Sequence, residues 1–206
     1  MFAKDYRARA WEKLRGNWGM AILVCFLYAL IVGAISALPV AGVASLLISG
    51  PLAVGLATAF LSLSRTGETK VDVLFGGFTQ NFVNNFLAYL LQTLFVFLWT
   101  LLFIIPGIVK GYSYAMTYYI LADHPEMSAN DAITRSREMM RGHKWQLFCL
   151  HFSFIGWILL SVITCGILFI WVVPYMQQAD AEFYENIKGE DNKPSEESDA
   201  SEQPTA

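Results

Sequence analysis

The longest uncharged run in the sequence covers 47 residues, from Trp18 to Ser64, and it constrains the fold more than any other feature. An α-helix rises about 1.5 Å per residue and the hydrocarbon core of a bilayer is about 30 Å thick, so one crossing needs about 20 residues. As a single helix the run would extend about 70 Å. We therefore expect two transmembrane spans, at about 18–38 and 41–63, with a turn at Pro39, because proline lacks the N–H that a helix needs.

A cleaved signal peptide is the alternative interpretation of the first apolar stretch, because a basic leader precedes it and alanine and serine are frequent near its end. A signal peptide has an apolar core of about 7–15 residues. The stretch from Gly19 to Leu38 is longer than that, and a second apolar run follows at once. A retained transmembrane span is therefore the better interpretation.

A second apolar block runs from Phe86 to Ala122 and is interrupted by Ile105-Pro106-Gly107 and by Lys110. We expect two short spans here, at about 86–104 and 108–122; the alternative is one long tilted helix. In the two-span arrangement the lysine lies near the outer turn, where its aliphatic stem lets the ammonium group reach the lipid headgroups.

The third block, from Trp145 to Ala179, contains no Asp, Glu, Lys or Arg. A break at Thr164-Cys165-Gly166 predicts spans at about 145–163 and 167–184. The second of these carries Pro174 and grades into an amphipathic segment. The alternative is therefore that this block crosses the membrane once, which would give five spans in all.

The distribution of arginine and lysine selects among these topologies, because both residues gather in cytoplasmic loops. Six spans place the basic leader (residues 1–17) on the same side as the loops that follow the first and second pairs of spans, and only Lys110 lies opposite. The basic residues on the leader's side, apart from the C-terminal tail, are Lys4, Arg7, Arg9, Lys13, Arg15, Arg65, Lys70, Arg135, Arg137, Arg141 and Lys144. The predicted fold is an all-α polytopic transmembrane helical bundle of six spans in three helical hairpins, with both termini in the cytoplasm.

The C-terminal segment is strongly acidic. Nine acidic residues against two lysines give residues 180–206 a net charge of −7, so the first 179 residues carry +4 of the whole-chain −3. The end of this segment is rich in Ser, Glu, Asp and Pro, a composition that cannot bury enough apolar surface to fold. We expect a transmembrane domain at 18–187 and a disordered acidic cytoplasmic tail at 188–206.

Each predicted hairpin is preceded by a segment with apolar residues at helical spacing. The stripes are Ala3, Tyr6, Ala10 and Leu14 before the first hairpin, and Ala129, Ala132, Ile133, Ser136, Met139 and Met140 before the third. The segment from Val71 to Phe86 has similar spacing, although Gly76 and Gly77 weaken it. We expect amphipathic interfacial helices, the third of them started by a capping box at Ser128 and Asp131.

The first and third of these segments end alike, in Arg15-Gly16-Asn17-Trp18 and in Arg141-Gly142-His143-Lys144-Trp145. In both, glycine ends a basic helix and tryptophan falls where the membrane interface is expected. The residues predicted to contact anionic lipid or another membrane protein are Arg15, Trp18, Arg137, Arg141, Lys144 and Trp145. The alternative is that the basic residues only set the topology and the apolar stripes pack on the bundle. The similar endings suggest a weak internal repeat; the alternative is that their similarity is a coincidence.

No charged residue falls at the centre of a predicted span, where it would usually mark an ion or substrate pathway. Asp123 and His124 could form an acid/base pair, but the end of a helix before Pro125 and an aromatic belt explain them more simply. With Lys110, they are the candidate polar functional residues. His151, inside the fifth predicted span, is expected to form a hydrogen bond with a neighbouring helix.

No catalytic, cofactor or metal site is predicted. The three cysteines have apolar neighbours and form no C-x-x-C pair, and the motifs of nucleotide-binding loops, zinc proteases and serine hydrolases are absent. Membrane orientation accounts for the basic residues, so no nucleic-acid partner is expected.

Several motifs in the second half of the chain resemble those of a family of bacterial integral membrane proteins catalogued as domain of unknown function 975. The motifs are Ile105-Pro106-Gly107-Ile108, Tyr119-Ile120-Leu121-Ala122-Asp123, Ser136 with Met139-Met140-x-Gly142-His143-Lys144, Phe152-Ser153-Phe154-Ile155-Gly156-Trp157, Thr164-Cys165-Gly166-Ile167, and Pro174-Tyr175 through Ala181-x-Phe183-Tyr184. Together they cover roughly residues 70–187. The resemblance implies a polytopic protein of the bacterial plasma membrane, and it implies no activity and no catalytic residues.

The leading functional hypothesis is a non-enzymatic envelope component that organises, assists or senses through its cytoplasmic helices, because basic amphipathic segments flank a bundle with no charge at its centre. The second hypothesis is a small transporter or channel, based on the hairpins, the prolines and the candidate repeat. The third is a membrane enzyme that uses Asp123, His124 or His151. The sequence leaves the formation of homo-oligomers open.

Overall fold

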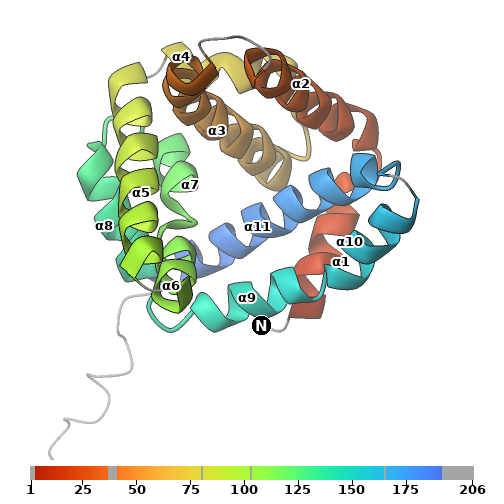
Figure 1. Ribbon diagram of the computed structural model, residues 1–206. Coiled ribbons are helices and arrows are strands. Elements are labelled where there is room, and N and C mark those ends of the chain that lie inside the picture. Colours follow the sequence, from red (N-terminus) through yellow and green to blue (C-terminus); the bar gives the residue numbers. More distant parts are fainter. Residues whose placement is uncertain (1–2, 37–40, 80, 103, 165, 192–206) are drawn as a thin grey trace, which may run out of the picture.

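The computed structural model describes residues 3–36, 41–79, 81–102, 104–164 and 166–191. Within these ranges every regular element is helical (Figure 1). The elements are α1 (Ala3–Leu14), α2 (Trp18–Ser36), α3 (Ala41–Thr66), the 3₁₀-helix η1 (Val71–Phe75), α4 (Gly76–Thr79), α5 (Phe82–Leu102), α6 (Ile104–Tyr114), α7 (Thr117–Asp123), α8 (Ala129–Met139), α9 (Lys144–Phe152), α10 (Ile155–Ile163) and α11 (Phe169–Asp191).

Two helices, α3 and α11, form the interior of the fold. In Figure 1, α11 crosses the middle of the molecule, where it packs against α1, α2 and α3. In turn, α3 packs against α2, α5 and α7. The apolar stretch Leu47–Thr66 of α3 is 67% buried, whereas Phe82–Leu101 of α5 is 11% buried. α3 is therefore a central helix, and α5 presents most of its surface outward.

Glycines allow the short segment formed by η1 and α4 to lie directly against α3. A Cβ atom at Gly55 would overlap the backbone of Leu74, and one at Gly77 would overlap the backbone of Pro51. Small residues at such positions let two backbones approach closely, as they commonly do between membrane helices. The glycines of this region therefore serve helix packing.

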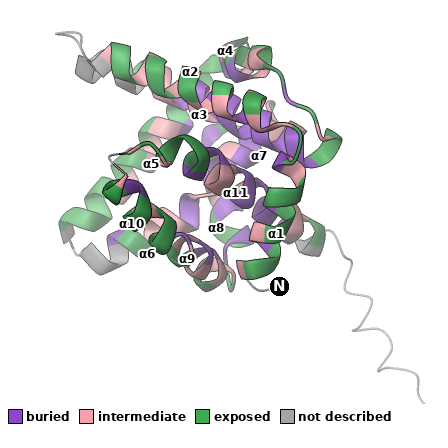
Figure 2. Ribbon diagram, turned by 90° about the vertical axis from the view of Figure 1, so that its right-hand side faces the viewer, coloured by how far each residue is buried: buried purple, intermediate pink, exposed green. Residues whose placement is uncertain are grey.

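Four helical stretches are long and apolar enough to cross a membrane, by length and composition: Trp18–Ile35, Leu47–Thr66, Phe82–Leu101 and Lys144–Ile163. The outer sides of α2, α5 and α10 carry many exposed residues, drawn in green in Figure 2. Large apolar residues are among them, such as Phe26, Phe97 and Ile163. Soluble monomers rarely leave apolar surface of this extent in water. The fold is all-helical, and its outer surface is suited to lipid.

In the first half of the chain the helices coincide closely with the predicted spans. α2 covers most of 18–38, and α3 covers 41–63 and three residues more. The predicted turn around Pro39 lies outside the described residues.

The block from Phe86 to Ala122 is not one continuous helix. α6 packs along α5, with Gly107 against Thr100, so the alternative of a single long tilted helix is wrong. A turn at Ala115-Met116 separates α6 from α7 and divides the predicted span 108–122. These helices of 11 and 7 residues are not among the four candidate spans.

The last apolar block is also divided. A turn at Ser153-Phe154 separates α9 from α10, and both helices belong to one candidate span. A second turn precedes α11, as the predicted break at 164–166 requires, although residue 165 itself lies outside the described ranges. Gly166 has a φ of 86°, in the left-handed region that glycine adopts without a steric penalty.

The C-terminal helix α11 begins at Phe169 and covers the predicted span 167–184 except for its first two residues, but it is not among the four stretches apolar enough to cross a membrane. Six spans therefore stay a prediction. The helix continues to Asp191, so residues 188–191, which were assigned to the disordered tail, are helical. The rest of that tail, residues 192–206, lies outside the described residues.

The leader and the segment before the third predicted hairpin form α1 and α8, and their apolar stripes pack on the bundle. The buried members are Tyr6, Ala10 and Leu14 in the first, and Ala129, Ala132, Ile133, Ser136, Met139 and Met140 in the second.

The hydroxyl of Ser128 accepts a hydrogen bond from the backbone N–H of Asp131, as the predicted cap requires. Gly16 and Gly142 follow the two helices with φ of 98° and 82°, a conformation that commonly ends helices. The segment from Val71 to Phe86 is instead divided among η1, α4 and α5.

Candidate functional site

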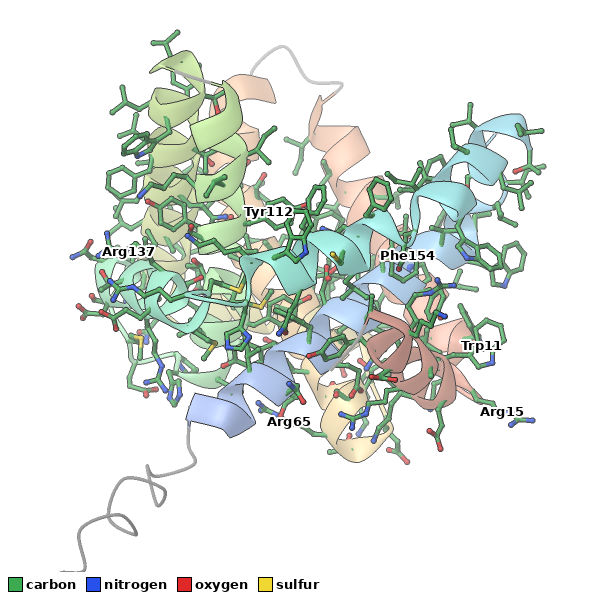
Figure 3. All side chains as sticks on the ribbon, turned by 90° about the horizontal axis from the view of Figure 1, so that it is seen from below. Trp11, Arg15, Arg65, Tyr112, Arg137 and Phe154 are labelled. Carbon is green, nitrogen blue, oxygen red and sulfur yellow. The ribbon has the colours of Figure 1, made fainter. Side chains whose placement is uncertain are left out.

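The six residues predicted to contact lipid or a partner fall into two separate groups. One group is Arg15 and Trp18, and the other is Arg137, Arg141, Lys144 and Trp145. Figure 3 shows Arg15 and Arg137 near opposite edges of one face. Both arginines and Arg141 are exposed, and none of the three is in an ion pair within the described part of the chain. Trp145 is 71% exposed, whereas Trp18 packs inward on other aromatic rings.

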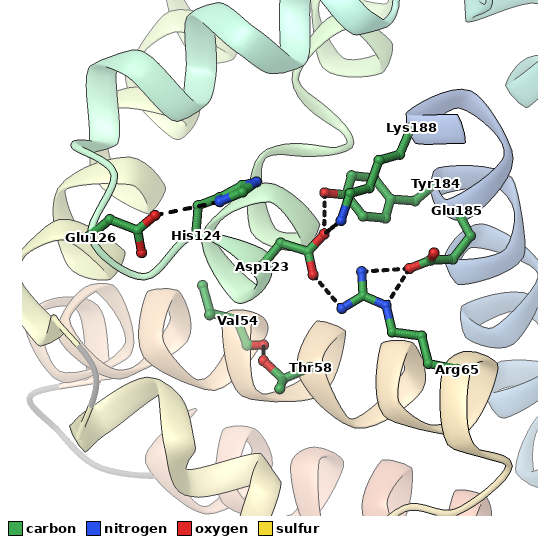
Figure 4. A network of polar contacts seen from close by, with 9 residues as sticks. All are labelled: Val54, Thr58, Arg65, Asp123, His124, Glu126, Tyr184, Glu185 and Lys188. Atoms are coloured by element: carbon green, nitrogen blue, oxygen red, sulfur yellow. Dashed lines mark hydrogen bonds and ion pairs between the residues drawn. The ribbon is translucent and has the colours of Figure 1, made fainter. Parts of the chain in front are cut away.

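A closed network of charges joins the ends of α3, α7 and α11 (Figure 4). The carboxylate of Asp123 lies 2.5 Å from Nη1 of Arg65 and 2.6 Å from Nζ of Lys188. Tyr184 donates a hydrogen bond of 2.8 Å to the same carboxylate. Nε of Arg65 also donates to Glu185 at 2.7 Å. Each of the four charges in this network has a partner of opposite sign.

The surroundings of Asp123 keep it ionised. Its side chain is 4% exposed. Burial acts to raise the pKa of Asp123, but hydrogen bonds from Arg65, Lys188 and Tyr184 outweigh burial and lower this pKa to about 2. Near neutral pH, Asp123 is therefore a carboxylate that holds three helices together.

The structure does not bring Asp123 and His124 together as an acid/base pair. Figure 4 shows the carboxylate of Asp123 turned toward α11 and His124 turned toward Glu126. Nδ1 of His124 lies 3.4 Å from the carboxylate of Glu126. In the described parts of the chain, no group of three or more His, Cys, Asp or Glu side chains is placed to hold a metal ion.

A second buried acid connects α3 to α11. The hydroxyl of Ser64 donates a hydrogen bond of 2.6 Å to Oε1 of Glu182, and Nε2 of Gln178 donates to the same oxygen at 3.1 Å. Glu182 is 7% exposed. Buried acids are stable only where such donors compensate for lost water, so this contact also holds α11 against α3.

Two residues that the sequence singled out contact neighbouring helices. Nε2 of His151 on α9 lies 2.9 Å from the carboxylate of Asp180 on α11, which confirms the predicted hydrogen bond to another helix. The ring of Tyr112 on α6 is 5.8 Å from the imidazole, centroid to centroid. Nζ of Lys110 lies 4.8 Å from the centre of the Trp99 ring on α5, a cation–π contact.

The model of the family described as protein of unknown function (DUF975) matches residues 1–110 and 103–191. The chain belongs to the DUF975 family. The match confirms the resemblance indicated by the motifs in the second half of the chain. It also includes the leader and the first predicted hairpin. Comparisons with curated proteins and with solved structures gave no match.

Most of the charged network of this DUF975 protein was not predicted from the sequence. The sequence identifies Glu185 and Lys188, like Glu182 of the second contact, only as parts of a charged C-terminal segment, and Arg65 only as a residue of a cytoplasmic loop. A usable signal was present, because apolar residues continue at helical spacing through Ala179, Phe183 and Ile187, all of which are buried. That spacing extends the helix and places the acids beside the end of α3.

Proposed function

We propose that this protein is a non-enzymatic component of the bacterial plasma membrane that organises or assists other envelope components through α1 and α8. One observation carries the proposal: the charged groups differ in how they are paired. Those of the Asp123 network are paired within the chain, whereas Arg15, Arg137 and Arg141 are exposed and outside the ion pairs of the described residues. Exposed guanidinium groups of this kind attract phosphates and carboxylates of other molecules.

Contacts between the two ends of the chain support the proposed orientation. The ring of Tyr6 on α1 lies 5.2 Å from that of Phe183 on α11, and Asn186 donates a hydrogen bond of 3.2 Å to the Tyr6 hydroxyl. Segments in direct contact lie on the same side of a membrane, which favours an even number of spans. Six spans meet this condition, as do the four candidate spans, and five do not. The basic leader then places both termini in the cytoplasm.

The proposal is tested by capture from native membranes. A photocrosslinker beside α8 in the full chain should trap a reproducible anionic lipid or membrane protein. The double charge reversal Arg137→Glu/Arg141→Glu should reduce the yield, because two of the exposed cations are inverted. The matched variant Arg137→Lys/Arg141→Lys keeps the charge and should retain it. Equal recovery by the parent and the charge-reversed chain would contradict the proposal.

A small transporter is the second candidate, and the contact between His151 and Asp180 favours it. An ionisable pair on helices that line a membrane bundle commonly marks an ion or proton pathway. Purified protein in sealed vesicles should then pass a proton or a small solute faster than empty vesicles do, and His151→Gln should slow this passage. Vesicles that leak no faster than empty ones across a broad solute panel would eliminate this candidate.

A further inference from the structure

An aromatic cavity lies where α1, α2, α10 and α11 meet. Its volume is about 330 Å³, within the range of about 300–1,000 Å³ that ligand sites occupy. Four of the six tryptophans in the chain and one tyrosine line it, namely Trp11, Trp18, Trp157, Trp171 and Tyr175. The ring of Trp11 lies 5.2 Å from that of Trp18 and 5.8 Å from that of Tyr175, centroid to centroid. Trp11, Trp157 and Trp171 are exposed, so the cavity opens to the surface.

A basic hollow adjoins this cavity, and Tyr175 lines both. The two charged residues that line the hollow are Lys4 and Arg7. Among the described residues, Nη1 of Arg7 donates to the carbonyl of Ser153 alone, at 3.5 Å, and the guanidinium lies 5.2 Å from the centre of the Phe154 ring. Its buried Nε has no hydrogen-bond partner among the described residues. Within the described residues, Arg7 therefore has no acid partner. Because a guanidinium carries five N–H donors, several of them are left for a ligand.

The backbone around Arg7 is held in place by the same tyrosine. The hydroxyl of Tyr175 donates a hydrogen bond of 2.9 Å to the carbonyl oxygen of Arg7, and its ring packs at 5.1 Å from that of Phe154. Figure 3 shows Trp11 and Phe154 on the same side of this face of the molecule. The hollow and the cavity are thus two parts of one fixed arrangement, one cationic and one aromatic.

We propose that the hollow and the cavity together bind one anionic glycerophospholipid of the inner leaflet. The phosphate lies between Lys4 and Arg7, and the first part of an acyl chain lies in the aromatic cavity. Guanidinium and ammonium groups both bind phosphate, and tryptophan rings favour the boundary between headgroups and acyl chains. The assignment rests on the proposed function, because it needs α1 at the cytoplasmic surface.

Charge and surroundings select this ligand over two others. Aromatic walls also attract the quaternary ammonium of a zwitterionic lipid, but Lys4 and Arg7 repel that group. A soluble acidic peptide is disfavoured because α10 and α11, which line the cavity, also carry exposed apolar side chains, such as Leu159 and Ile170. Such a surface has lipid as its neighbour in a membrane.

The position of the tryptophans provides a direct test. The full chain with Trp99→Phe and Trp145→Phe retains only the four tryptophans of the cavity. It is reconstituted in phosphatidylcholine vesicles that contain a fixed fraction of either phosphatidylglycerol or phosphatidylcholine with brominated acyl chains, which quench tryptophan fluorescence on contact. We expect brominated phosphatidylglycerol to quench more strongly than brominated phosphatidylcholine.

Single substitutions then locate the cause of this preference. Lys4→Gln and Arg7→Gln should each weaken the relative affinity for phosphatidylglycerol about five-fold, the effect of one basic residue near an anionic surface. Arg9→Gln is the matched control, since Arg9 is exposed on the same helix but lines neither hollow nor cavity. Lys4 is exposed, so Lys4→Gln keeps the test decisive even if Arg7→Gln fails to fold.

Three results would overturn the lipid site: equal quenching by the two brominated lipids, an equal effect of Lys4→Gln and Arg9→Gln, or a co-purifying protein that shields the tryptophans from both lipids. The proposed function fails in a different experiment, when charge reversal on α8 leaves the captured partner unchanged. Loss of partner capture on α8 variants, together with equal quenching by both lipids, would retain the proposed function and remove this site.

Discussion

Asp123 and Arg7 are both charged residues in contact with an aromatic side chain, Tyr184 and Phe154 respectively, but their surroundings differ. Asp123 is 4% exposed and takes donors from Arg65, Lys188 and Tyr184, so its charge is compensated within the chain. Arg7 lines a hollow that opens to the surface and donates to one carbonyl oxygen. The first arrangement stabilises the fold, and the second leaves donors for a ligand. The difference predicts that a variant at Asp123 mainly lowers stability, whereas a variant at Arg7 mainly lowers the preference for an anionic lipid.

Asp123→Asn should cause the largest loss of stability, because it leaves Arg65 and Lys188 without the carboxylate between them. We expect the free energy of unfolding to fall by about 2–3 kcal/mol, less than the 3–5 kcal/mol for a fully buried pair, because Arg65 is 39% exposed. Thermal unfolding in detergent measures this loss. Glu126→Gln is the control, since Glu126 is 76% exposed. An Asp123→Asn protein as stable as its parent would show that the network does not hold the helices.

Acid should remove the stabilisation that the Asp123 carboxylate provides, because it protonates this group. The pKa of Asp123 is about 2 in the folded chain, below the value of about 3.9 for a free aspartate. The stabilisation is therefore fully present above about pH 4 and is lost as the pH falls through about 2. It amounts to about 2–3 kcal/mol, because one pKa unit corresponds to about 1.4 kcal/mol. Unfolding midpoints of the parent and of Asp123→Asn, measured between pH 7 and pH 2, should differ by a constant amount down to about pH 4 and then converge. A gap that stays constant to pH 2 would contradict this assignment.

Glu182→Gln tests the buried contact of Glu182 with Ser64 and Gln178 at nearly constant side-chain volume. The amide loses the charge that strengthens hydrogen bonds from Ser64 and Gln178, so we expect a loss of about 1 kcal/mol. Glu12→Gln on the exposed side of α1 is the matched control. A Glu182→Gln protein that is more stable than the parent would show that burying this charge costs more than its two hydrogen bonds return.

Arg7→Gln should have the smallest effect on stability. It removes a cation–π contact with Phe154, worth about 0.5–1 kcal/mol at a partly exposed site. The Arg7→Gln variant should nevertheless lose much of its preference for phosphatidylglycerol, whereas Asp123→Asn should leave that preference intact. Unfolding and quenching are measured on the same preparations of both variants. If Arg7→Gln unfolds as readily as Asp123→Asn, the two sites do not differ in the way proposed.

Where the physical cause of a structure is local, the sequence was sufficient to predict it. The spacing of Tyr6, Ala10 and Leu14 predicts one buried helix face, and all three are buried. Gly16 and Gly142 end α1 and α8 with positive φ, which depends on glycine itself. The motifs of the second half identified the family. Apolar runs longer than one crossing located α2 and α3 within a few residues.

Other boundaries carry no local signal. The turns at Ala115-Met116 and Ser153-Phe154 contain neither glycine nor proline, so the division of α6 from α7 and of α9 from α10 follows from packing. Charge was a poor guide to the end of the last helix. Residues up to Asp191 are helical because their apolar side packs on the bundle, although their composition resembles that of the tail.

By itself, the sequence determined that this chain forms apolar helices with basic, partly buried helices beside them, because length, charge and helical period are properties of neighbouring residues. Only the tertiary structure decided which charged residues form ion pairs within the chain and which do not. Arg65 and Glu185 are 120 positions apart, and Tyr175 is 168 positions from the Arg7 carbonyl that it binds. Contacts over such separations depend on how helices pack, and no local pattern records that packing.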